Sequence, residues 1–177
     1  LVGSEMCIRD SYSISTGQTT TANVTAKSLT VSGITASNKT YDGNAVATLN
    51  TGLVAYSGLV GGDTFNGTYT GAFSDKNVGT GKTVTITPSY SGADVSNYSV
   101  TDQSSTTANI TAKSLTVSGI TASDKIYDGS MSATLTGTAV YSGLVSGDTF
   151  TGSYSGVFVD ANVGTGKTVT ITPSYSG

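Results

Sequence analysis

Apolar and polar residues alternate along much of this chain. Leu29 and Val31 alternate with Ser and Thr over residues 28–32, and Val84 and Ile86 alternate with Thr over residues 83–87. A period of two places the apolar side chains on one face of a strand, whereas an amphipathic helix repeats about every 3.6 residues. The pattern therefore predicts strands that bury one face and expose the other.

The stretch 65–73 shows this alternation most clearly. Phe65, Tyr69 and Phe73 share one face with two glycines, while the other face is small or polar. A second version of the stretch, residues 150–158, keeps every aromatic residue and glycine on that face, and all four differences fall on the other face. Because a core-facing side restricts substitution more than a water-facing side, we expect the aromatic face to point inward.

An internal repeat organises the chain. Residues 21–92 align with residues 107–177, and residues 12–25 match residues 98–111. This self-similarity predicts the tail strand of a preceding repeat at 11–26, a complete repeat at 27–112 and a second repeat, cut short at its C-terminal end, at 113–177. Residues 1–10 hold the only Cys, Glu and Arg and resemble a foreign sequencing scar. A genuine but divergent N-terminus is the alternative.

Glycine with Asp or Asn marks a turn roughly every ten to fifteen residues. We therefore expect an all-β or mostly β chain of small β-grasp-like or sandwich domains, arranged as beads on a string with about six or seven strands each. Residues 42–49 and 128–135 are the places where a short helical turn fits the sequence. Only residues 111–113 separate the two repeats, so we expect restricted motion and a long, narrow rod.

Composition excludes several functions. The chain has no His, so His-dependent catalysis and the common zinc sites lack their ligands and bases. The mean hydropathy is +0.02, and no run approaches the ~20 apolar residues of a membrane span, so we expect no membrane insertion by these residues. The net charge is −3 and the eight basic residues are scattered singly, which disfavours nucleic acid as a partner. We expect no enzyme activity.

Six aspartates are candidates for a calcium site or for paired acids. Both uses need several oxygens to converge, and no Asp-x-Asp or Asp-x-Asn-x-Asp cluster brings them together. Capping of a turn by a single Asp is therefore the favoured interpretation, and no cofactor is expected. Calcium held across a junction or between loops stays open as the alternative. The six residues are Asp42, Asp63, Asp75, Asp128, Asp148 and Asp160.

Two further motifs allow more than one interpretation. Tyr41 and Tyr127 each precede Asp-Gly, which allows a sugar to stack on the ring, but a Tyr packed at a sheet end beside an Asp-Gly turn is favoured. Gly-Lys-Thr at 81–83 resembles the end of a Walker A motif. The Gly required five positions before Gly81 is replaced by Lys76, and a strand follows where the motif needs a helix, so we expect a turn.

Five segments of the chain occur in a characteristic order, and they are residues 29–33, 39–43, 75–84, 97–98 and 108–113. Together these segments resemble the YDG repeat domain of large bacterial surface proteins. The resemblance extends over residues 11–177. It implies tandem, mostly β-grasp-like modules of the kind found in filamentous-haemagglutinin-like adhesins, without established catalytic residues.

The resemblance also implies a role and a location. It points to stalk or spacer repeats on the outside of a bacterial cell, whose partners are the neighbouring repeats, while host or matrix glycans or proteins bind through other domains. The alternative is a carbohydrate- or calcium-binding repeat that contributes directly to adhesion. Because residues 11–25 are a spare version of most of the segment 93–111 that the second repeat lacks, we also expect head-to-tail association by strand donation.

Overall fold

The computed structural model describes residues 17–176, and regular structure in this range is almost entirely strand. One short helical turn, η1 (Val95–Asn97), precedes a strand of the first repeat. No helix in residues 17–176 has the length and apolar character needed to cross a membrane. The expected all-β class is therefore confirmed. The segment 1–10 and residues 11–16 of the expected tail strand lie outside the described residues.

The first repeat has ten strands, four of which are only two residues long. One sheet has the order β6-β1-β9, a second has the order β3-β10-β8-β7-β4, and β2 pairs with β5. Within the first sheet, β1 and β9 are parallel while β1 and β6 are antiparallel. The strands are β1 (Lys27–Ser32), β2 (Thr35–Ala36), β3 (Lys39–Thr40), β4 (Val46–Ala47), β5 (Leu49–Asn50), β6 (Ala55–Ser57), β7 (Asn66–Phe73), β8 (Gly79–Ser91), β9 (Tyr98–Thr101) and β10 (Ser105–Thr111).

The second repeat has seven strands in the described residues, and each corresponds to a strand of the first repeat, in the same order along the chain. Its pairings are β11 with β15, β12 with β14, and a three-stranded sheet in the order β13-β16-β17. The strands are β11 (Thr116–Ser118), β12 (Thr121–Ala122), β13 (Ser132–Ala133), β14 (Leu135–Thr136), β15 (Val140–Ser142), β16 (Thr151–Phe158) and β17 (Val169–Ser176).

The core of the first repeat lies between its two main sheets. Val31 of β1 packs in one cluster with Ile86 of β8, and Leu29 packs in another with Phe65 and Tyr98. Both main sheets therefore contribute to the core, which is the sandwich arrangement of the two expected from the sequence. A further cluster, which includes Phe73, Val84 and Ile110, packs against Ala36 of β2 and Leu49 of β5. Burial of these apolar side chains supplies most of the driving force for folding.

The predicted alternation is confirmed where it was clearest. Leu29 and Val31 are buried on β1, and along β7 the aromatic and glycine face is buried or half-buried while the opposite residues are exposed. The expected helical turn at 42–49 is wrong. Residues there form β4 and β5 instead, because Val46 pairs with Ala72 of β7 and Leu49 pairs with Ala36 of β2. The counterpart 128–135 likewise contributes to β13 and β14.

The second repeat has a partly open core. The described residues contain no counterpart of β9 or β10 in this repeat. In the first repeat, residues 79–83 of β8 pair with β10. The matching residues 164–168 have no such partner strand, so β17 begins later than β8 does and is shorter. Ile86 is 5% exposed, whereas its counterpart Ile171 is 37% exposed. Within residues 17–176, one side of this sheet core is therefore uncovered.

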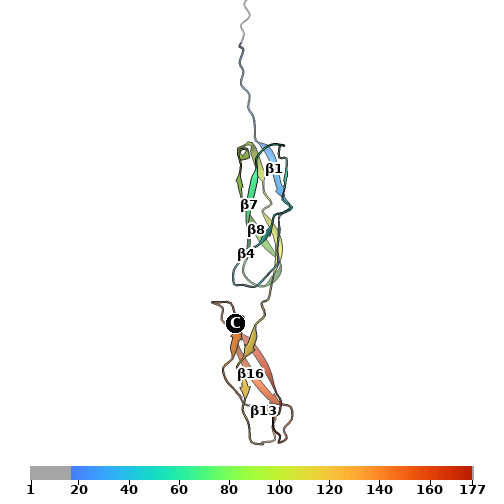
Figure 1. Cartoon of the computed structure of the whole chain (residues 1–177), viewed down its shortest axis with the longest axis vertical. Coiled ribbons are helices and arrows are strands. Elements are labelled where there is room, and N and C mark those ends of the chain that lie inside the picture. Colours follow the sequence, from blue (N-terminus) through green and yellow to red (C-terminus); the bar gives the residue numbers. More distant parts are fainter. Residues whose placement is uncertain (1–16, 177) are drawn as a thin grey trace, which may run out of the picture.

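The two repeats lie end to end along the long axis of the chain (Figure 1). Strand β10 runs directly through Ala112 and Lys113 into the second repeat, so the join is short. In the described part of the expected tail strand, residues 17–26 form no strand and are exposed.

Candidate functional site

Four of the six candidate aspartates are paired with lysines inside their own turns. Lys39 Nζ lies 2.7 Å from Asp42 Oδ1, and Lys82 Nζ lies 2.7 Å from Asp75 Oδ1. The second repeat keeps both pairs, as Lys125 with Asp128 and Lys167 with Asp160. Each carboxylate also accepts the backbone N–H of the residue two positions further on, which defines an Asx turn.

These contacts favour the charged form of each carboxylate. The hydrogen bond from Lys125, together with that from the backbone N–H of Ser130, lowers the pKa of Asp128 to about 2. Bonds from lysine and from a backbone N–H likewise lower the pKa values of the other three. A carboxylate that already holds a lysine and a backbone donor serves its own turn. In residues 17–176, no three acidic or cysteine side chains come close enough to hold a metal ion.

Asp63 has a different partner within the first repeat. It accepts a hydrogen bond from the Tyr98 hydroxyl, which in turn accepts the backbone N–H of Val60 at 2.9 Å. Burial and the adjacent Asp63 carboxylate both raise the pKa of Tyr98, since an ionised phenol would lie beside a negative charge. The loop 60–63 is thus held to β9 by one buried tyrosine.

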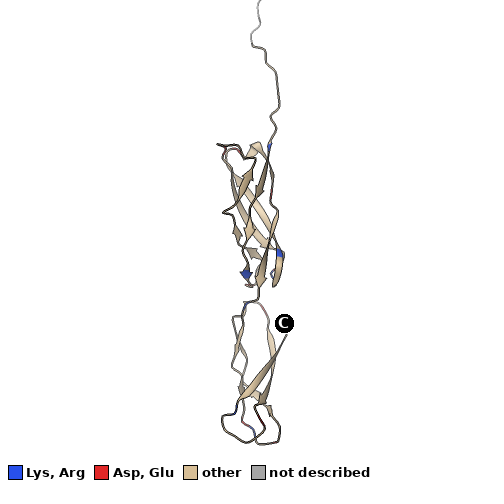
Figure 2. Cartoon of the chain, turned by 90° about the vertical axis from the view of Figure 1, so that its right-hand side faces the viewer, with Lys and Arg blue, Asp and Glu red and all other residues tan. Residues whose placement is uncertain are grey.

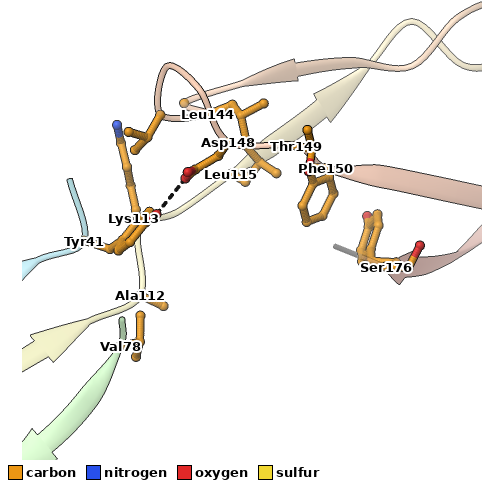
Figure 3. Close-up of a pocket in the computed structure, with 13 residues that line it drawn as sticks. Tyr41, Val78, Ala112, Lys113, Leu115, Leu144, Asp148, Thr149, Phe150 and Ser176 are labelled. Atoms are coloured by element: carbon orange, nitrogen blue, oxygen red, sulfur yellow. Dashed lines mark hydrogen bonds between the residues drawn. The ribbon is translucent and has the colours of Figure 1, made fainter. Parts of the chain in front are cut away.

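The counterpart of Asp63 lies at the junction between repeats, where it meets the other repeat. The Tyr41 hydroxyl donates to Asp148 Oδ2 at 2.8 Å (Figure 3). Lys76 Nζ lies 3.9 Å from Asp148 Oδ1. The hydrogen bond to Asp148, followed by burial, raises the pKa of Tyr41. Tyr41 is half-buried here and is not an open platform for a sugar, whereas Tyr127 is exposed at the far end of the second repeat.

The glycine of the same motif also belongs to the junction. Gly43 has a φ of +83°, which a side-chain-bearing residue rarely adopts. A Cβ at this position would lie 2.8 Å from Val145 Cγ1 of the second repeat. The tight approach of Val145 therefore depends on glycine.

A cavity of about 460 Å³ adjoins this contact. Its lining includes Leu115, Phe150 and Tyr175 of the second repeat together with Tyr41 and Asp148. The counterparts of the first three in the first repeat are Leu29, Phe65 and Tyr90, which pack in one cluster with Tyr98. The cavity therefore occupies the place that a tyrosine of β9 fills in the first repeat.

The sequence identifies Tyr41 and Asp148 as separate candidates and gives no sign that they pair. They are 107 positions apart, and neither has a local pattern that names the other. Val145 and Gly43 were not singled out as contacts. The recurrence of Tyr-Asp-Gly and of Val-x-Gly-Asp in both repeats was the available signal, since it marks two ends of one repeating unit.

The comparisons with known proteins agree with the division of the chain into two repeats. The model of the YDG domain matches residues 25–108 and again residues 111–177. No curated protein and no solved structure matches the chain. Since the two matches together span most of the sequence and follow the two structural repeats, the chain belongs to the YDG domain family and carries two consecutive copies.

Proposed function

We propose that these repeats are non-catalytic spacers in the stalk of an extracellular, adhesin-like bacterial surface protein of the filamentous-haemagglutinin type. The observation that carries the proposal is the end-to-end arrangement of two YDG repeats with a short join and direct contacts across it (Figure 1). A spacer has to hold its units in line, and a short join with cross-contacts restricts their relative motion.

The surface chemistry supports the same role. Charged residues make up only 11% of the chain, and most of the ribbon in Figure 2 has the tan colour of uncharged residues. Four of the candidate aspartates serve turns through their lysine partners, and a fifth, Asp63, binds Tyr98. These residues are occupied with holding loops together, which suits a module whose task is to keep its shape.

Small-angle X-ray scattering of the whole chain tests the spacer role. A compact globule of 177 residues has a radius of gyration of about 16 Å, and we expect a distinctly larger value with an elongated distance distribution. The same measurement with millimolar calcium, and a glycan array, test the binding alternative. A compact particle, a calcium-dependent change in scattering or a specific glycan signal contradicts the proposal.

A further inference from the structure

The junction residues are covered only where two repeats meet. Val78 lines the junction and is 54% exposed, while its counterpart Val163 at the outer end of the second repeat is 87% exposed. Tyr41 is half-buried, whereas Tyr127 is 63% exposed. At the opposite end, Val60 is 44% exposed and matches the half-buried Val145. Each repeat thus carries one end of the Tyr41 type and one end of the Val145 type.

We propose that the Tyr-Asp-Gly motif is a clasp between consecutive repeats, which binds the Val-x-Gly-Asp loop of the next repeat. In this clasp, the tyrosine hydroxyl donates a hydrogen bond to the aspartate of the loop. The glycine has no side chain, so the valine of the loop can pack directly against its backbone. The partner of each outer end is therefore another YDG repeat. This inference rests on the proposed spacer role and adds the contact that holds the spacers in line.

The aspartate of the Val-x-Gly-Asp loop can accept hydrogen bonds from two tyrosines, one from its own repeat and one from the preceding repeat. Asp63 accepts the hydroxyl of Tyr98 from its own repeat, and Asp148 accepts the hydroxyl of Tyr41 from the preceding repeat. A carboxylate has about four acceptor positions, so one such residue can hold both bonds at once. The Lys76 ammonium adds a positive charge near the same carboxylate. The clasp and the internal anchor of the loop are thus compatible.

Substitution of Tyr41 by Phe tests the clasp, because it removes the hydroxyl and keeps the ring. The measurement is NMR residual dipolar couplings at a concentration where the chain is monomeric. In the unmodified chain we expect one alignment tensor to fit both repeats. In Tyr41→Phe and in Asp148→Ala we expect each repeat to require its own tensor. Tyr127→Phe is the matched control, since it changes the same motif at the exposed outer end.

The outcomes separate the clasp from the spacer role. A single shared tensor in Tyr41→Phe and Asp148→Ala overturns the clasp, and so does an equal change in Tyr127→Phe. Neither result alters the elongated scattering profile or the absence of glycan binding on which the spacer proposal depends. Conversely, a glycan signal contradicts the spacer role without restoring a common tensor in the variants.

Discussion

Substitution of Leu29 by Ala is expected to lower the free energy of unfolding of the first repeat by about 2–5 kcal/mol. Leu29 is completely buried and packs with Phe65 and Tyr98, so its removal leaves a cavity that both sheets must line. Phe65 and Tyr98 are themselves buried and their rings pack against each other, which limits how far the structure can collapse into the space.

The chain supplies a matched control for this prediction. Leu115 is the counterpart of Leu29 and is half-buried beside the open cavity of the second repeat. Leu115→Ala therefore removes fewer contacts, and we expect a cost below about 2 kcal/mol. Urea titration with hydrogen-exchange mass spectrometry of peptides from each repeat measures both values separately. Equal losses in the two variants would show that the second core is closed after all.

Much of the fold follows from the sequence because it depends on local rules. The alternation around Leu29 and the aromatic face of β7 both report which side of a strand is buried, and the structure confirms both. The sequence repeat also predicts the lack of the last strands in residues 113–177. The short strands β4 and β5 were not predictable in this way, since their hydrogen bonds depend on β7 and β2, which lie elsewhere in the sequence.

The candidate site was predictable only in part. Aspartates beside Gly or Asn indicate Asx turns, and Asp42 and Asp75 form them. The lysine that completes each turn comes from three or seven positions away, and nothing in the spacing fixes its direction. The contact between Tyr41 and Asp148 depends on how one repeat docks onto the next. Such a contact is a property of tertiary packing, which no local pattern encodes.

Substitution of Gly33 by Ala is expected to destabilise the first repeat by about 2–5 kcal/mol. Gly33 has a φ of +86°, and this left-handed conformation costs a residue with a side chain about 1–2 kcal/mol. A Cβ would also lie 2.2 Å from the carbonyl oxygen of Leu53. Because that oxygen belongs to the backbone, it cannot rotate away, and overpacking of this kind costs a further 1–3 kcal/mol or so.

Gly81 separates the two causes. Its φ is +60°, yet a Cβ there would meet nothing within 4 Å, so Gly81→Ala carries the conformational cost alone. We therefore expect about 1–2 kcal/mol for Gly81→Ala, and the difference between the two variants isolates the contact with Leu53. Chemical denaturation of both variants gives this difference directly. Equal losses in the two variants would mean that the loop 52–54 moves aside freely. We expect unequal losses, because Gly33 itself cannot shift easily: the next residue, Ile34, is 1% exposed in the core.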